Sequence, residues 1–275
     1  MLGCEFRLRS EGPPPVTDLT SLSPEHHALI KKLQSIAPLS DEEMRELVSL
    51  PLNVKHVGPD IDIAREGDRP SECCLVAEGF LCRYKFTAEG RRQIFSFHIA
   101  GDIPDLQSLE LKVMDHYLGT LTPAKVAFIP HQSVLHLMST CTRIARVLWR
   151  DTLIDAAVFR EWMMGIGRSS AVTRIAHVLC EIFVRLRAVG LAGERECVVP
   201  LTQAEFGDAL GLSTVHVNRS LQELRGRGLI RLSGGVLTIL DWAGLEAMGE
   251  FDLTYLHLDG SPGDIGPDTS TGVRS

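Results

Sequence analysis

The chain lacks long apolar runs, catalytic motifs and CxxC cysteine pairs. No apolar run reaches the roughly 18 residues that a membrane-spanning helix requires, so we expect no transmembrane segment. No Walker phosphate loop, GxSxG serine motif, HExxH metal motif or dinucleotide fingerprint is present, so we expect no enzyme. The seven cysteines, an odd number without CxxC spacing, are most consistent with reduced thiols in a cytosol.

The first residues, MLGCEFRLRSEGPPPVTD, lack the apolar core of a secretion signal, which also favours a cytoplasmic protein. Residues 1–21 are rich in proline, glycine, serine and threonine, and we expect them to be disordered. The whole chain has 275 residues, of which 44% are hydrophobic, and this is enough for two domains with apolar cores.

Charge is distributed unevenly along the chain. The net charge of −7 argues weakly against nucleic acid as a partner. Residues 141–240, however, carry 13 Lys and Arg against 9 Asp and Glu, whereas residues 241–275 carry 1 against 7. The basic middle block is compatible with a nucleic-acid surface or with an ordinary solvated helical face.

The first half of the chain predicts helices followed by a β domain. Ser23 precedes a helical pattern, and Ser40 with Glu43 has the spacing of a capping box, so helices are expected within residues 24–49. From about 52 to 132, glycine turns separate short β-type runs at intervals of 9, 12, 11, 11 and 18 residues. Turns at this spacing are typical of an all-β sandwich or barrel.

A helical pattern over residues 133–164 carries a broad apolar stripe, which is about 45 Å long at 1.5 Å per residue. Such a helix must bury its stripe, either against its own β domain or against a second copy of the chain. Asp151 and Asp155 interrupt a strict heptad repeat. We predict a dimerisation helix whose seam contains these side chains: Cys141, Ile144, Val147, Leu148, Ile154 and Val158.

A cleaner amphipathic helix, TRIAHVLCEIFVRLRAVG, ends at Gly190. The later stretch LTQAEFGDALGLSTVHVNRSLQELRGRGLI contains two short helical patterns that nearly touch. Thr202 and Glu205 have capping-box spacing, Gly211 suits the end of the first helix, and Ser213 suits the N-cap of the second.

A short turn of this kind holds two helices at a steep angle, which is the geometry of a helix-turn-helix motif. The following LIRLSGGVLTIL predicts a hairpin that would form the wing of a winged helix-turn-helix. The alternative is an ordinary helical hairpin with a polar face. The side chains expected to contact bases or phosphates are Thr202, Gln203, Ser213, Thr214, Val215, His216, Asn218 and Arg219.

The chain resembles the Crp/Fnr family of bacterial transcription regulators over roughly residues 24–245. Three stretches carry the resemblance: AREGDRPSECCLVAEGFLCRYKFTAEGRRQIFSFHIAGD, VTRIAHVLCEIF and the helix-turn-helix stretch. The resemblance implies an α+β fold with an N-terminal β-roll, or jelly-roll, sensor domain related to cyclic-nucleotide-binding domains. It further implies a long central dimerisation helix and a C-terminal winged helix-turn-helix. The implied protein is a homodimer that binds two-fold symmetric DNA and contacts RNA polymerase.

These patterns divide the chain into five parts. The expected parts are a disordered segment at 1–21, a β-roll domain at 22–132, a dimerisation helix at 133–164, a DNA-binding domain at 165–245 and a C-terminal tail at 246–275.

The chain departs from the family where its members hold effectors. Relatives that bind cyclic AMP carry Gly-Glu-Leu and then Arg-Ala or Arg-Ser after a Gly-Asp turn, but GDIPDLQSLELKVMDHYLGTLTPAKVAFIP contains neither. No arginine lies between Arg92 and Arg143, and a buried phosphodiester without an arginine would be poorly compensated. We therefore do not expect cyclic AMP to bind.

Other cofactors of the family are not expected either. Relatives with an iron–sulfur cluster use several N-terminal cysteines, whereas this chain has only Cys4 there. Relatives with haem use a histidine of the β domain, but a lone histidine more often lies on the surface or in a satisfied core. The available histidines are His98, His116, His131 and His136. At least one of Cys73 and Cys74 is expected to be buried and inert. Because none of these residues indicates a bound group, no cofactor or metal is assigned.

The sequence thus predicts a dimeric, sequence-specific DNA-binding regulator whose effector is unknown or absent. Two alternatives stay open: a sensor that binds a nucleotide, haem or another small molecule in the β-roll, and an interaction module that has lost DNA binding. Thr214 and Val215 stand where the family often has Arg and Glu, while Arg219 keeps the family's next arginine. We expect methyl contacts with thymine and one contact between Arg219 and guanine.

Overall fold

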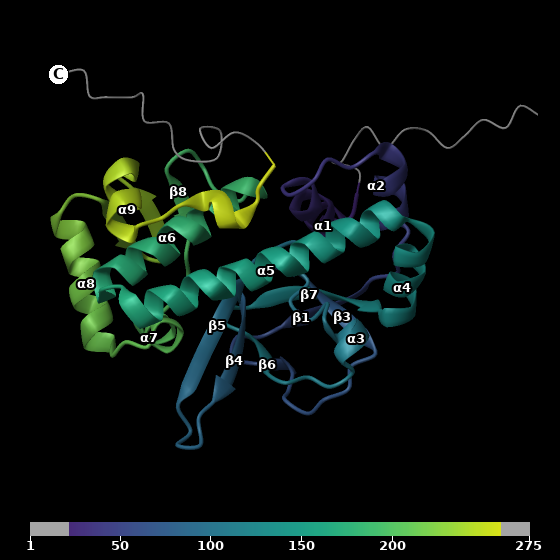
Figure 1. Ribbon diagram of the computed structural model, residues 1–275, viewed down its shortest axis with the longest axis horizontal. Helices are drawn as coiled ribbons and strands as arrows, with labels where there is room; N and C mark the ends of the chain where they lie inside the picture. The colour runs from purple at the N-terminus through teal and green to yellow at the C-terminus, as the bar shows by residue number, and fades with distance from the viewer. Residues whose placement is uncertain (1–21, 260–275) are drawn as a thin grey trace, which may run out of the picture.

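The computed structural model of the chain describes residues 22–259. Two predictions lie outside the described residues: the disordered segment at 1–21, and the tail where it passes residue 259. Cys4 also lies outside them. Figure 1 shows a mixed α+β molecule built around one long helix, with a β domain against one side and a largely helical domain at one end.

Two short helices precede the β domain, α1 (Pro24–Gln34) and α2 (Asp41–Val48). The side chain of Ser23 caps α1, as its position before the helical pattern predicts. At α2 the Glu43 carboxylate accepts a 2.7 Å bond from the Ser40 N–H, and the Ser40 hydroxyl accepts one from the Glu43 N–H. The predicted capping box is confirmed, because short-range cap chemistry suffices to fix a helix start.

The β domain contains two antiparallel sheets, which confirm the predicted β-roll. One sheet has the order β1-β7-β3 and the other has the order β2-β6-β4-β5. Apolar side chains from both sheets, including Val76, Leu81, Leu118 and Val126, pack into one core. The bounds are β1 Asn53–Val57, β2 Asp62–Ala64, β3 Glu72–Glu78, β4 Leu81–Phe86, β5 Arg92–His98, α3 Ser108–Leu111, β6 Tyr117–Thr120 and β7 Ala124–Pro130.

The single helix predicted over residues 133–164 is in fact two helices, α4 (His131–Thr140) and α5 (Thr142–Arg168). The break is at Cys141, whose φ of −118° and ψ of 85° are not helical. The hydroxyls of the last two residues of α4 donate to the carbonyl of His136 at 2.7 and 3.0 Å. Such side-chain bonds compete with the backbone ladder and favour a helix end. No glycine or proline marks this break, so the apolar pattern alone could not predict it.

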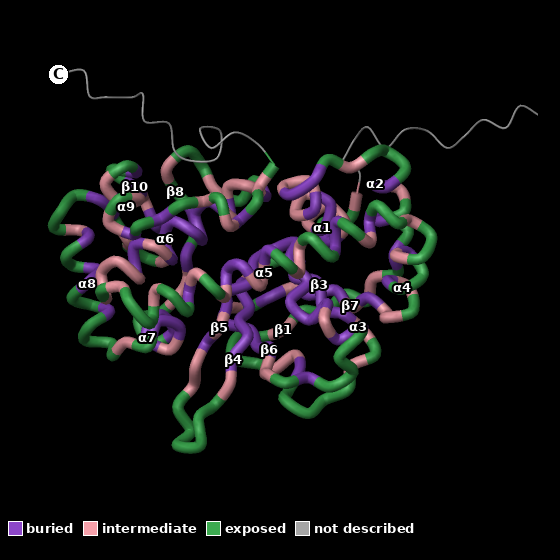
Figure 2. Tube along the Cα trace, viewed as in Figure 1, coloured by how far each residue is buried: buried purple, intermediate pink, exposed green. Residues whose placement is uncertain are grey.

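The long helix α5 is the axis of the molecule (Figure 1). One side of it is buried against α1, α2 and β3, where Ile144, Val147 and Ile154 join a core with Leu29 and Leu75. Further along α5, apolar side chains instead join the core of the C-terminal domain. The helix therefore connects the two domains through continuous packing, and Figure 2 shows this buried line along its length.

The C-terminal domain combines a helical bundle with a three-stranded sheet of order β8-β10-β9. Its bounds are α6 Ala171–Ala188, β8 Glu196–Val198, α7 Gln203–Leu210, α8 Thr214–Gly226, β9 Ile230–Ser233, β10 Val236–Ile239, α9 Trp242–Gly249 and the 3-10 helix η2 Leu253–Leu256. Gly234 and Gly235 both have positive φ, as a tight turn between two strands requires, so the predicted hairpin is confirmed. The stretch between α6 and α7 contains the additional short strand β8.

The expected tail at 246–275 begins too early, because residues 246–259 are folded onto the body. Helix α9 continues to Gly249, and Phe251 and Leu256 are buried. The segment then runs along α5 toward α1 (Figure 1). Arg150 donates to the carbonyl of His257 at 3.1 Å, and the N–H of Asp259 donates to the carbonyl of Ser35 at 2.7 Å.

Candidate nucleic-acid interface

The turn between α7 and α8 has the geometry that its residues predict. The Glu205 carboxylate accepts a 2.6 Å bond from the Thr202 N–H, which completes a capping box at the start of α7. Gly211 ends α7 with a φ of 64°, and the Ser213 hydroxyl accepts a bond from the backbone of α8. A Cβ at Gly207 would lie 2.6 Å from the carbonyl oxygen of Leu212, so glycine is needed where the turn folds back on α7.

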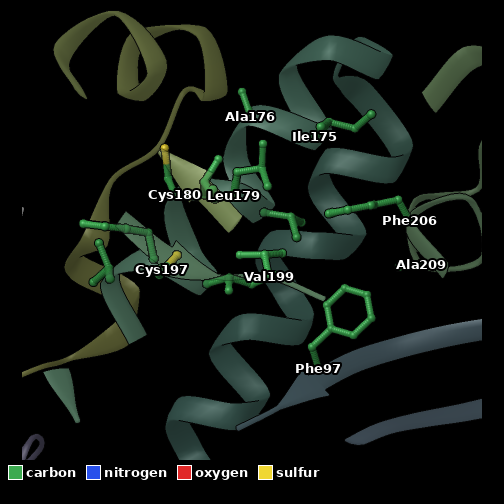
Figure 3. Close-up of a cluster of buried hydrophobic side chains, with 14 of the residues drawn as sticks. Phe97, Ile175, Ala176, Leu179, Cys180, Cys197, Val199, Phe206 and Ala209 are labelled. Carbon is green, nitrogen blue, oxygen red and sulfur yellow. The ribbon is translucent and has the colours of Figure 1, made fainter. Parts of the chain in front are cut away.

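The inner face of α8 holds the motif against the rest of the domain. Val217, Leu221 and Leu224 are buried in the same core as Phe206. Figure 3 shows Phe206 of α7 with Ile175 of α6 in this cluster. Because apolar contacts occupy this face, the opposite face of α8 is left to solvent, as Figure 2 shows.

The outer face of α8 carries every side chain that the sequence assigned to base contact. Thr214, Val215, His216, Asn218 and Arg219 are all exposed, and Val215 is 67% exposed despite being apolar. Within residues 22–259, Arg219 has neither a hydrogen-bond partner nor an ion-pair partner. These side chains are thus brought together on one surface that is open to solvent.

The remaining predicted contact residues lie beside this surface. Thr202, Gln203 and Ser213 are exposed at the first turns of α7 and α8. The Gln203 side-chain oxygen accepts a 3.4 Å bond from the amide of Asn218, which links the two helices. The Thr202 and Ser213 oxygens accept cap bonds from the backbone, and the Ser213 oxygen also lies 3.2 Å from His216 Nδ1. The hydroxyl proton of Thr202 is still able to donate to a phosphate.

Other arginines near the motif are held within the domain. Arg225 donates to the carbonyl of Leu232 at 2.9 Å, Arg227 pairs with Glu223 at 2.7 Å, and Arg231 of the wing lies 3.7 Å from the carboxylate of Glu196. Of the arginines on α8, Arg219 is the one without a partner among the described residues.

The side chains predicted for the dimer seam lie inside the chain itself. Ile144, Val147, Leu148, Ile154 and Val158 are all buried. Cys141, the sixth predicted residue, is half-buried at the break between α4 and α5. The apolar stripe is therefore covered by the chain's own domains, and its assignment to an intermolecular seam is corrected.

The opposite face of α5 carries a second, exposed apolar stripe. Trp149, Leu153 and Met163 are 64%, 49% and 70% exposed, and Ala156 and Arg160 fall on the same line. Successive positions in this set are four and three residues apart in alternation, which is heptad spacing. The heptad spacing of the exposed stripe is present in the sequence. The buried stripe, however, is longer and more apolar, and for that reason it was the one assigned to the dimer seam.

Side chains of β5 fasten the helix-turn-helix to the β-roll. The Arg92 guanidinium lies 2.8 Å from the Asp208 carboxylate of α7. The Phe97 and Phe206 ring centroids are 6.5 Å apart, and Figure 3 shows Phe97 reaching from the β domain toward the C-terminal core. The orientation of α7 and α8 is thus tied to that of the β-roll.

A cavity of about 480 Å³ lies where the β-roll, α1, α5, α6 and the C-terminal segment meet. Several of its lining side chains are charged and paired. Lys32 of α1 lies 3.0 Å from Asp102 and 3.3 Å from Asp151. Arg185 of α6 lies 2.8 Å from Asp102. Burial alone would lower the pKa of Lys32, but the two carboxylates outweigh burial and raise it.

Arg83 of β4 also lines this cavity, and no motif in the sequence marks it as a site residue. Its Nε donates to the carbonyl of Pro104 at 2.6 Å, and its Nη1 pairs with Asp155 of α5. Arg83, Lys32 and Arg185 come from segments far apart in the chain, so no local pattern could group them.

The histidines considered for haem have different environments. His98 is buried, and its Nε2 lies 2.8 Å from the Ser96 hydroxyl oxygen. Burial lowers the pKa of His98 to about 4. The His131 ring lies 2.9 Å from the Ser108 hydroxyl, and His136 is exposed. His116 lines the cavity, and its Nε2 atom is buried without a hydrogen-bond partner among the described residues.

The cysteines and metal-binding residue types give no further site in the part of the chain described. Cys73 and Cys74 are both buried, and burial raises the pKa of each thiol, so neither has thiolate character. Between residues 22 and 259, no three His, Cys, Asp or Glu side chains are grouped so that they could hold a metal ion. Across the same residues, every helix is too short or too polar to span a bilayer.

Two family models match the chain. Residues 54–141 match a cyclic nucleotide-binding domain, and residues 173–248 match a Crp-like helix-turn-helix domain. The two matches fall on the β-roll with α4 and on the C-terminal domain, and the whole of α5 lies between them.

Several characterised proteins are similar over most of their length. Transcriptional activator protein FnrA of Stutzerimonas stutzeri is 26% identical over 184 residues, which cover 67% of this chain and 75% of that protein. Nitrogen fixation regulation protein FixK of Bradyrhizobium diazoefficiens is 28% identical over 212 residues, covering 76% and 87%. The solved structure of FixK2 from Bradyrhizobium japonicum superposes with a TM-score of 0.66 at 25% identity, covering 72% of this chain and 98% of that one.

Proposed function

Since this chain belongs to the Crp/Fnr family of transcription regulators, we propose that it binds a two-fold symmetric DNA operator as a homodimer, with α8 in the major groove. It is a DNA-binding regulator of this type, with a helix-turn-helix domain and a cyclic-nucleotide-binding-like domain. The observation that carries the proposal is the outer face of α8, where five polar or methyl-bearing side chains lie exposed together.

We assign separate roles to the residues of this face. Arg219, which has no partner among the described residues, reads guanine O6 and N7. Thr214 and Val215 contact thymine methyl groups, and His216 and Asn218 contact a base or the backbone. The capping residues and their neighbour position the motif on phosphates: Thr202, Gln203 and Ser213.

The dimer seam is proposed on the exposed face of α5. Trp149, Leu153 and Met163 offer apolar contact at heptad spacing, and a second copy of the same helix has the complementary pattern. An isologous contact of two such helices would set two α8 helices side by side, as two inverted half-sites about one helical turn apart require.

The remaining proposals follow from the family and the packing. We propose a cytoplasmic protein that contacts RNA polymerase, with domain limits close to those given by the sequence. Three limits move: the central helix begins at Thr142, it extends to Arg168, and residues 246–259 belong to the C-terminal domain.

Selection of binding sites from random DNA tests the DNA-binding proposal. The wild type is expected to enrich an inverted repeat with one strongly preferred guanine in each half-site. Arg219→Ala is expected to lose about 1–3 kcal/mol of affinity and the preference at that one position. Arg227→Ala is the matched control, because Arg227 follows the other end of α8 and pairs with Glu223. If Arg219→Ala enriches the same consensus to the same degree, Arg219 is not a base reader.

A second candidate function is gating of DNA binding by a small molecule in the β-roll. The cavity of about 480 Å³ favours it, because its volume is in the range of small-molecule sites and its walls come from both domains. Comparing DNA affinity with and without a bound ligand separates a gated regulator from an ungated one.

A further inference from the structure

The last described part of the chain lies beyond the helix-turn-helix match, which ends at residue 248. We call residues 250–259 the C-terminal strap. The strap leaves the DNA-binding domain after α9, passes along α5 and ends beside α1 (Figure 1). It therefore connects the DNA-binding domain to the opposite half of the molecule, in addition to the single-chain connection between α5 and α6.

The strap begins where the backbone comes very close to α6. A Cβ at Gly249 would lie 2.7 Å from the backbone nitrogen of His177, so glycine is needed for this approach. The His177 Nδ1 lies 3.2 Å from the Gly249 carbonyl oxygen. The same imidazole ring stacks on Tyr255, with ring centroids 5.8 Å apart and an interplanar angle of 14°. The first half of the strap is thus packed tightly onto one helix of the DNA-binding domain.

A buried carboxylate of α6 anchors the middle of the strap. Glu181 has no exposed surface, and its Oε2 accepts a 2.8 Å bond from the Tyr255 hydroxyl and a 3.0 Å bond from the Trp162 indole of α5. Its Oε1 accepts a 3.2 Å bond from Arg185, which also pairs with Asp102 of the β-roll. The Tyr255 hydroxyl therefore joins the strap to a polar network that contains α5, α6 and the β-roll. Hydrogen bonds to a charged group are stronger than neutral ones, so this donor is an effective anchor.

The far end of the strap is fixed to α5 and to the residue that follows α1. Glu250 and His257, near the two ends of the strap, have φ angles of 48° and 47° although neither is glycine. Such angles persist where surrounding contacts determine them. Beyond the second one, Arg150 donates to the His257 carbonyl at 3.1 Å, and the Asp259 N–H donates to the Ser35 carbonyl at 2.7 Å. The strap is therefore held at both ends.

The strap does not cover the face that we propose for DNA contact. It runs away from α8 toward α1 (Figure 1). Thr214, Val215 and Arg219 are exposed while the strap is in place. An effect of the strap on DNA binding therefore acts through the orientation of the DNA-binding domain and not through masking of α8.

We propose that the C-terminal strap holds the DNA-binding domain in the orientation that binds operator DNA, with Tyr255 as its positioning residue. A domain that is already oriented loses less conformational freedom when two α8 helices engage one operator. A single half-site requires no fixed relation between two domains, so the strap matters for the full operator and little for a half-site. This inference rests on the proposed binding of a two-fold operator by a homodimer, and it adds a determinant of affinity outside the helix-turn-helix.

Hydrogen exchange of the full-length wild type, with and without operator DNA, gives the direction of the coupling. By linkage, a strap that favours operator binding must itself be favoured by bound operator. The backbone amides of residues 253–259 are therefore expected to exchange more slowly in the complex. Faster exchange in the complex would show that the closed strap opposes DNA binding, and unchanged exchange would show that the two are not coupled. Either result overturns the inference.

Two substitutions in the full-length chain loosen the strap. Tyr255→Phe removes the bond to Glu181 but keeps the stacked ring, and exchange of the strap amides should become about 10- to 100-fold faster. Leu258→Ala removes apolar contact with the cores on both sides of the strap. The double variant is expected to bind the full operator about three- to tenfold more weakly and to keep its half-site affinity and preferred bases. Tyr117→Phe, in β6, is the matched control and should change neither affinity.

Fluorescence anisotropy with full-operator and half-site DNA separates the outcomes. An equal loss on both DNAs would show that the double variant damages the helix-turn-helix domain itself, and this contradicts a positioning role. Unchanged or higher operator affinity despite faster amide exchange also overturns the inference. Failure of the wild type to bind an inverted repeat contradicts the proposed function. Intact wild-type binding without any dependence on the strap contradicts this inference alone, and the exchange experiment decides it even where the double variant does not fold.

Discussion

Trp149→Asp and Ile144→Asp, two substitutions on opposite faces of α5, should have opposite consequences. Trp149 is 64% exposed, which at roughly 200 Å² for a tryptophan side chain leaves about 130 Å² for a partner helix. At about 25 cal/mol per Å², this area is worth about 3 kcal/mol in each protomer. A two-fold dimer carries the Trp149→Asp substitution in both protomers, so this free energy is lost twice. Even if only half of the total is realised, dimerisation should weaken about 100-fold. The folded monomer should keep its melting temperature.

Ile144→Asp should instead unfold the chain. Ile144 has no exposed surface and lies in the core shared with α1 and β3. A carboxylate buried there without a partner costs several kcal/mol, a large part of the 5–15 kcal/mol that stabilises an ordinary domain.

Sedimentation velocity and thermal unfolding, measured on both variants, separate the two outcomes. Trp149→Phe serves as the control, because it keeps an aromatic ring at the seam. Operator affinity should fall with dimerisation in Trp149→Asp. A Trp149→Asp protein that still sediments as a dimer, or an Ile144→Asp protein that forms folded monomers, would refute the assignment of the two faces.

The structure leads to three further predictions. Cyclic AMP should not shift the melting temperature, because the cations of the cavity are paired within the chain. A ligand present at 100 times its Kd would stabilise the folded protein by about 2.7 kcal/mol, so a rise in melting temperature that corresponds to this free energy would contradict the prediction. Burial raises the pKa of Asp105 from 3.8 to about 7, so its contribution to stability is present in full below pH 3.8 and is lost as the pH rises to about 7. Asp105→Asn should therefore be stabilising relative to the wild type at pH 8 but not at pH 4, and melting curves that differ equally at both pH values would rule this out. Gly207→Ala places a Cβ 2.6 Å from the carbonyl of Leu212 and should cost about 1–3 kcal/mol while weakening operator binding; unchanged unfolding and anisotropy data would show that the turn tolerates a methyl group.

Features of the fold that depend on neighbouring residues were predictable from the sequence. The caps at Ser40 and Thr202, the glycine that ends α7 and the hairpin of the wing all lie where local chemistry predicts them. The outward set on α8 was predictable for the same reason, because helical periodicity decides which side chains share a face.

Features that depend on distant contacts were not predictable in the same way. The apolar stripe of α5 fits two partners equally well, and only the folded chain shows that its own domains cover it. Strand β8 is three residues long and pairs with β10 far along the chain. The cavity brings Lys32, Arg83 and Arg185 together from three separate elements, and no local spacing in the sequence predicts that they meet.

The bond between Asp259 and Ser35 also has a consequence for biosynthesis. It joins the segment after the first helix to the last described residues, so it closes almost the whole described chain into a loop. During translation, α1 and the β-roll leave the ribosome long before this partner exists, and contacts between such distant residues form late. The C-terminal wall of the cavity is thus set in place late, after α1 and the β-roll have been synthesised. A nascent or prematurely ended chain would hold this site open to water.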